Sequence, residues 1–309
     1  MEALYDEVMP YESGYLKVSD IHEIYYEQCG NPNGLPIVYV HGGPGGGSGE
    51  LARKFFDKNK YRIIIFDQRG CGRSKPFVEL RENTTFDLVS DMETLRKKLN
   101  IDKWILFGGS WGTALSLVYA INYPEFVSGM ILRGIFLARQ EDVDWLYCGG
   151  AAQFFPEAFD KYISVLSDSE RKDIIGSYMK YLGSSDMNIV AKYAKYWNDW
   201  ESSCVSLYPR ELAKEVTDYD IAIARMECHY FFNKSFLPED NYILNNVDRI
   251  KDIRTYICHG RYDVDCRPSG AYELYKNMNN CELVFVDACG HSSMEPLMAA
   301  QLIEFTDKW

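Results

Sequence analysis

The chain has 309 residues and is acidic, with 45 aspartates and glutamates against 33 lysines and arginines and a net charge of −12. Hydrophobic residues make up 47% of it, which is typical of a soluble globular protein and allows a sizeable core. The excess of acids excludes nucleic acid as a partner, because phosphate binding needs a basic surface. It also disfavours docking on an anionic membrane surface.

The N-terminus and the cysteines predict a cytoplasmic protein. The first residues contain neither the basic region nor the apolar run of a signal peptide, and no apolar run reaches the ~18 residues that span a bilayer. The nine cysteines are an odd number, scattered singly with no C-x-x-C pair. That pattern predicts neither a disulfide framework nor a structural zinc site.

The predicted elements begin with a hairpin formed by residues 15–20 and 23–28, which carry β-branched and aromatic side chains around a polar turn. Short apolar runs bounded by glycine or polar residues follow. Their length and nearly continuous apolar character indicate strands of a parallel sheet that is buried on both faces. These runs are residues 37–40, 61–66, 104–107, 130–132, 255–258 and 283–286.

Helical patterns separate the strands. Apolar residues recur at spacings of three and four from Phe86 to Leu99, after a possible N-cap at Thr84 or Thr85, and a second pattern covers 113–122. This alternation predicts a doubly wound α/β sheet. The alternation stops near Leu137 and resumes near Ile250, so we expect a catalytic domain of 1–136 and 249–309 with an inserted helical cap of 137–248. The cap carries eight of the twelve net negative charges.

Ser110 is the predicted nucleophile. It lies in GGSWG (108–112), between an apolar strand and a helix. A G-x-S-x-G motif in that context is typical of a nucleophile elbow, where small neighbours let the chain turn sharply and expose the serine hydroxyl. A glycine-rich turn without function is the alternative.

A serine needs a base and an acid that orients the base, and in this fold both follow late strands in the order Ser, Asp, His. His291 directly follows the last strand run and is the predicted base. We expect Asp263 as its acid and interpret Asp265, in the same loop, as a solvated turn residue. The remaining histidines are expected to be surface or core residues: His22, His41, His229 and His259.

The glycine-rich loop HGGPGGG (41–47) follows the strand run 37–40. No G-K-[ST] follows it and its spacing does not match a dinucleotide loop, so a phosphate site is the weaker interpretation. As an oxyanion loop it would offer the Gly43 N–H beside that of Trp111 to a tetrahedral intermediate.

Six motifs in this order resemble the proline iminopeptidases, which are prolyl aminopeptidases of the α/β-hydrolase fold. The resemblance implies the triad Ser110, Asp263 and His291 and removal of an N-terminal proline from peptides with a free amine. The motifs are HGGPGGG (41–47), FDQRGCGRS (66–74), GGSWG (108–112), LRGIF (132–136), HGRYD (259–263) and CGHS (289–292).

The resemblance also implies that acids of the cap bind the imino group, and the matching residues are Glu201 and Glu227. A secondary ammonium in a dry pocket needs such carboxylates, although each could instead be a solvated cap residue. Arg133 and Phe136 match positions near the substrate, with a structural ion pair as the alternative for Arg133. Cys266 matches a cysteine beside the triad acid, either reactive towards thiol reagents or buried and inert.

Two departures from the family pattern concern the pocket. Leu146 stands where the family usually has a tyrosine, and VDCRP (264–268) replaces a shorter run that ends in CP. We expect no metal or organic cofactor. The alternatives to a prolyl exopeptidase are a broader aminopeptidase, an amino-acid amidase or an esterase with the same triad, or a catalytically silent binding module, which the intact triad disfavours.

Overall fold

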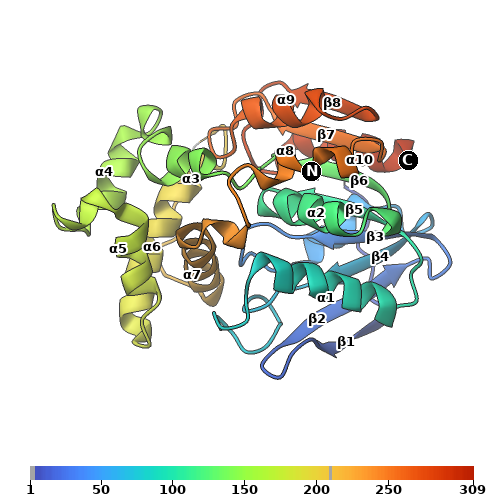
Figure 1. Cartoon of the computed structure of the whole chain (residues 1–309), viewed down its shortest axis with the longest axis horizontal. Coiled ribbons are helices and arrows are strands. Elements are labelled where there is room, and N and C mark those ends of the chain that lie inside the picture. Colours follow the sequence, from blue (N-terminus) through green and yellow to red (C-terminus); the bar gives the residue numbers. More distant parts are fainter. Residues whose placement is uncertain (1–3, 209–210) are drawn as a thin grey trace.

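An eight-stranded sheet organises the protein, in the order β1-β2-β4-β3-β5-β6-β7-β8 (Figure 1). The computed structural model describes residues 4–208 and 211–309. Strands β1 and β4 pair antiparallel with β2, and all other neighbours are parallel. The predicted hairpin and the six predicted strand runs are confirmed. The strands are β1 (Glu12–Lys17), β2 (Glu23–Gly30), β3 (Leu35–Val40), β4 (Tyr61–Phe66), β5 (Trp104–Gly109), β6 (Val127–Arg133), β7 (Thr255–Gly260) and β8 (Cys281–Val286).

Successive residues of the central strands face two different cores. Ile37 packs with the last helix, α10 (Pro296–Lys308), whereas its neighbour Val38 packs with helices α1 (Thr85–Lys98) and α2 (Trp111–Asn122). Side chains of a strand alternate between its faces, so a sheet covered on both sides requires apolar residues at every position. This explains the continuous apolar runs of the sequence.

The two predicted helices beside the sheet are α1 and α2. The hydroxyl of Thr84 accepts a hydrogen bond from the N–H of Asp87, whose carboxylate accepts one from the N–H of Thr84, and this capping box starts α1. Helix α2 begins directly after Ser110. The remaining helices on the sheet side are α8 (Tyr242–Asn245) and α9 (Pro268–Lys276).

A separate group of helices lies to one side of the sheet and connects β6 to β7 (Figure 1). Aromatic rings form its core: Tyr147 stacks on Trp197 with ring centroids 4.2 Å apart, and Tyr162 stacks on Tyr178 at 4.8 Å. In the described residues, no helix is both long and apolar enough to cross a membrane. The helices of the group are α3 (Gln140–Tyr147), α4 (Pro156–Ser164), α5 (Ile174–Leu182), α6 (Met187–Cys204) and α7 (Asp218–Phe232).

Candidate active site

Ser110 stands at the turn between β5 and α2. Its backbone has φ 57° and ψ −128°, a conformation that costs an L-residue about 1–3 kcal/mol and is typical of residues whose surroundings hold them in place. Glycines make the turn possible, because a Cβ at Gly108 would lie 2.5 Å from the carbonyl oxygen of Gly112. The side chain of Ser110 lines a pocket beneath the helices of 137–248.

His291 and Asp263 form a hydrogen-bonded pair in the loops after β8 and β7. His291 Nδ1 donates to Asp263 Oδ2 at 2.8 Å, and Asp263 Oδ1 accepts from the Cys266 N–H at 2.8 Å. Both side chains are buried. Burial lowers the pKa of His291, but the charges of Asp263 and Asp265 outweigh it and raise that pKa. The pair can therefore stabilise an imidazolium, as the base of a serine hydrolase must.

Arg133, at the end of β6, occupies the other nitrogen of the imidazole. Its Nη1 lies 3.1 Å from His291 Nε2 and donates to the His291 carbonyl at 2.9 Å. In the described chain Ser110 Oγ makes no hydrogen bond to His291. Arg133 also makes no ion pair with a carboxylate of the described residues, so the structure does not support a structural ion pair for Arg133. Catalytic hydrogen bonds often form only in the substrate complex.

The loop that holds His291 is tied to the helices above it. The Val205 carbonyl, just after α6, accepts hydrogen bonds from the N–H groups of His291 and Ser292, at 2.9 and 3.0 Å. Glu295 adds a bridge, accepting from the Leu207 N–H at 2.8 Å and from the Gly290 N–H at 2.6 Å. Three hydrogen bonds thus join the segment after α6 to the loop of the predicted base, and the bond from Gly290 braces that loop internally.

Two backbone N–H groups beside Ser110 are available to a ligand. Trp111 is the first residue of α2, where an N–H has no carbonyl of its own helix to bind. Gly43 lines the same pocket as Ser110, and within the described chain its N–H has no hydrogen-bond partner. The glycine-rich loop lies against the serine, since a Cβ on Gly42 would be 3.2 Å from the Ser110 Cβ.

A pocket at the sheet edge is lined by Ser110 and by two glutamates on the helices above. Its apolar wall includes Phe136, which lies edge-on to Phe231 with centroids 5.7 Å apart. The residues that line it include Gly43, Ser110, Phe136, Leu146, Tyr147, Phe231, Glu201 and Glu227.

Glu227 on α7 is buried among hydrogen-bond donors. Its Oε2 accepts from the Trp197 indole N–H at 2.7 Å and from the Tyr147 hydroxyl at 3.1 Å. Burial raises the pKa of Glu227 to about 7, against the opposing effect of its hydrogen bonds. Burial and the charge of Glu227 raise the pKa of Glu201, on α6, well above its usual value. Both carboxyls therefore keep their protons to a higher pH than a carboxyl in water does.

The other four histidines are bound to backbone groups. His41 Nε2 accepts from the Gln68 N–H at 2.9 Å, and His259 Nε2 bonds the Cys266 carbonyl at 2.8 Å. His22 and His229 each bond a backbone carbonyl through Nε2. Burial lowers the pKa of all four, so they are neutral side chains of the framework.

Known proteins resemble this chain over nearly its whole length. Residues 36–296 match the family model described as alpha/beta hydrolase fold. The chain is 48% identical to a probable proline iminopeptidase of Leptolyngbya boryana, over 100% of this chain and 97% of that protein. It is 46% identical to the proline iminopeptidase of Arabidopsis thaliana, over 99% and 81%, and 44% identical to that of Neisseria gonorrhoeae, over 97% of both.

The chain belongs to the proline iminopeptidase family of α/β hydrolases. Among solved structures, a proline iminopeptidase-related protein of Thermus thermophilus is similar with a TM-score of 0.60 and 20% identity, over 97% of both chains. An esterase from Exiguobacterium antarcticum has a TM-score of 0.63 and 17% identity, over 96% of this chain and 100% of that one. At these identities the structures support the fold alone.

Asp265 corrects an expectation from the sequence. It is not a solvated turn residue: its side chain is 5% exposed, lines the pocket, and lies with Oδ1 4.0 Å from His291 Nε2. Its Oδ2 is buried and has no hydrogen-bond partner in the described residues. Burial raises its pKa. Asp265 falls in the run where this chain departs from the family pattern, and it adds a further carboxylate to a pocket already lined by Asp142, Glu201 and Glu227.

Leu146 is the other departure from the proline iminopeptidase pattern. It lines the pocket, and its carbonyl accepts a hydrogen bond from the Trp200 indole N–H at 3.0 Å. The next residue, Tyr147, supplies the polar aromatic group through its bond to Glu227. Cys266 is buried, and burial raises the pKa of its thiol well above the usual value, which favours the thiol over a reactive thiolate in the metal-free chain.

Proposed function

We propose that the protein is a serine exopeptidase that releases N-terminal proline from peptides. The observation that carries the proposal is the pocket, which is lined by Ser110, by the buried Glu227 and by the partly buried Glu201. A buried carboxylate selects a cation, because a charge taken out of water needs an opposite charge beside it. A carboxylate pair inside the pocket requires a free terminal amine, which is the property of an exopeptidase substrate.

The reaction uses the triad and the two free N–H groups. The substrate displaces the Arg133 guanidinium from His291 Nε2, which then takes the Ser110 proton as Oγ attacks the carbonyl of proline. The N–H groups of Gly43 and Trp111 bind the oxyanion. The imidazolium, oriented by Asp263, gives its proton to the leaving amine, and water then hydrolyses the acyl-enzyme.

The helices of residues 137–248 act in this proposal as a specificity cap on a catalytic domain of 1–136 and 249–309. They supply Glu201, Glu227 and the aromatic wall around them, and none of the triad. All nine cysteines are free thiols, and seven of them are buried, which fits a reducing compartment such as the cytoplasm.

Replacing the nucleophile tests the chemistry. Ser110→Ala is expected to lower kcat for a proline arylamide by about 10⁴–10⁶-fold, as for other triad serines. Ser90→Ala, an exposed serine on α1, is the matched control and keeps full activity. Retention of activity by Ser110→Ala would rule out the proposed acyl-enzyme.

Blocking the substrate amine tests the specificity. The chain is expected to cleave free proline arylamide and to leave its N-acetyl form intact, because the acetyl group removes the charge that the glutamates bind. Glu227→Gln is expected to raise KM for the free amine by about 10–100-fold, equivalent to the ~1.5–3 kcal/mol of a charged hydrogen bond. Equal rates on both substrates would instead indicate an esterase or a general amidase.

A further inference from the structure

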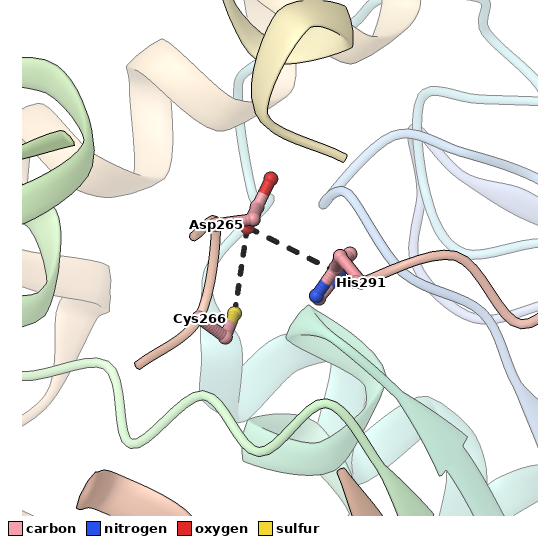
Figure 2. Close-up of side chains that lie close together, drawn as sticks. All are labelled: Asp265, Cys266 and His291. Carbon is pink, nitrogen blue, oxygen red and sulfur yellow. Dashed lines mark hydrogen bonds and ion pairs between the residues drawn. The ribbon is translucent and has the colours of Figure 1, made fainter. Parts of the chain in front are cut away.

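Three potential metal ligands converge beside the nucleophile. Figure 2 shows Asp265 and Cys266, from the loop after β7, turned towards His291, from the loop after β8. Asp265 Oδ1 lies 3.5 Å from Cys266 Sγ and 4.0 Å from His291 Nε2, and the three ligand atoms all lie within 4.8 Å of one another. All three residues are buried.

We propose that Asp265, Cys266 and His291 form an inhibitory site for zinc. An ion at the centre of a triangle of this size would lie at nearly the distance from each ligand atom that zinc requires. Zinc binds thiolate sulfur at about 2.3 Å and imidazole nitrogen or carboxylate oxygen at about 2.0–2.2 Å. A thiolate with an imidazole selects zinc over magnesium or calcium, which prefer oxygen ligands. Three protein ligands leave a fourth position, which opens to the pocket that Asp265 and Cys266 line together with Ser110.

The surroundings favour a divalent cation. The second oxygen of Asp265 is buried without a partner in the described residues, and in Figure 2 it points away from both Cys266 and His291, so the carboxylate has acceptor capacity left. Two further carboxylates add negative charge nearby. The charge of Asp263 acts on Asp265, and the charge of Asp265 acts on Glu227. On binding, zinc takes the place of the thiol proton of Cys266, which is released to solvent.

Zinc binding would stop catalysis by occupying the base. The Nε2 lone pair that accepts the Ser110 proton becomes a metal ligand, and the ion fills the space beside the serine. The guanidinium of Arg133 competes with the zinc ion for the lone pair of His291 Nε2, because its Nη1 lies 3.1 Å from that nitrogen. The ion must displace a cation from the imidazole, so the site is expected to bind more tightly when Arg133 is replaced by a neutral residue.

The test follows metal binding and activity separately on the full chain. Zn²⁺ is expected to inhibit reversibly, with EDTA restoring activity. Co²⁺ in its place is expected to give the absorption bands of a tetrahedral site with a thiolate-to-cobalt charge-transfer band. The inhibition rests on the proposed peptidase function, whereas the cobalt spectrum does not, so failure of one is distinguishable from failure of the other.

Variants assign the ligands, each compared with its own metal-free activity. Asp265→Asn is expected to raise the Zn²⁺ concentration for half-inhibition by about tenfold or more, since even loss of a residue that only orients a ligand costs about 10–100-fold. Cys266→Ser is expected to lose the charge-transfer band, and Arg133→Met to lower the half-inhibiting concentration. Cys148→Ser, which removes an exposed thiol, serves as the control and leaves all three readouts unchanged.

X-ray absorption of the zinc-loaded unmodified chain covers the case in which a variant fails to fold. One sulfur with nitrogen and oxygen neighbours supports the site, and a shell without sulfur overturns it. Inhibition and cobalt spectra that persist unchanged in both Asp265→Asn and Cys266→Ser overturn it equally.

Discussion

The raised pKa of Glu227 makes substrate binding depend on pH. A buried carboxyl whose pKa is raised is neutral below that pKa and charged above it. Glu227, with a pKa of about 7, therefore attracts an ammonium ion only as the pH rises through neutrality. The Kd of proline arylamide for the Ser110→Ala variant is expected to fall about tenfold from pH 6 to pH 8, as the charged fraction grows.

Calorimetric titration of the Ser110→Ala variant measures this Kd without turnover. The effect of His291 protonation on the catalytic rate therefore does not contribute to the measured pH dependence. The double variant with Glu227→Gln is expected to bind weakly with a nearly flat pH profile. Binding that weakens from pH 6 to pH 8 would contradict the assignment of Glu227 as the ammonium partner.

Individual pocket residues were predictable only where they belong to a recognisable sequence motif. Ser110, Asp263 and His291 are identified by order and position after strands, which local sequence reveals. Asp265 was misjudged because its burial depends on helices that lie far along the chain and fold over its loop. The contact of Arg133 with His291 joins residues 158 positions apart, and no spacing rule in the sequence indicates it.

At the scale of elements, the tie between α6 and the loop of the base is expected to set the catalytic rate. Glu295→Gln replaces one of two acceptor oxygens by an NH₂ group that faces another N–H. We expect it to lower stability by about 1.5–3 kcal/mol, the range for hydrogen bonds to a charged group. It is also expected to lower kcat more than it raises KM, because it displaces the base and leaves the glutamates in place.

Denaturant unfolding and steady-state kinetics check this prediction. Glu304→Gln, an exposed glutamate on the neighbouring helix α10, is the control and should change neither quantity. A variant that raises KM alone would show that Glu295 acts through the pocket and not through His291.

Strands and helices beside the sheet were predictable because their patterns are local. Residues 61–66 and 104–107 are apolar at nearly every position, and the capping box of Thr84 and Asp87 is written in four consecutive residues. The arrangement of α3 to α7 was not predictable in the same way. Their aromatic rings pack against rings of other helices, as Trp197 does on Tyr147. The position of each helix therefore depends on residues far away in the sequence, and its own local pattern does not indicate which residues these are.

At the scale of the whole molecule, the uneven charge is expected to speed the capture of cationic substrates. Residues 137–248 carry 19 acidic and 11 basic side chains, and residues from helices α3, α6 and α7 of this range line the pocket that contains Ser110. Such a field raises the rate of encounter with a positive ligand and is screened by salt, since the Debye length falls from about 30 Å at 0.01 M to about 10 Å at 0.1 M.

Over that range of salt, kcat/KM for proline arylamide is expected to fall by about two- to fivefold. Labelling of Ser110 by an uncharged fluorophosphonate is the control, and its second-order rate constant should stay constant. A free-amine substrate that is equally insensitive to salt would show that the acidic surface plays no part in capture.

The hydrogen bond between the Trp197 indole and Glu227 gives the protein an internal optical reporter. The emission of an indole depends on the electric field around it, and here the donor N–H lies 2.7 Å from a carboxylate oxygen whose charge changes near neutral pH. Ionisation of Glu227, or arrival of an ammonium ion beside it, should therefore shift tryptophan fluorescence. Occupancy of the pocket can then be followed in real time without any label.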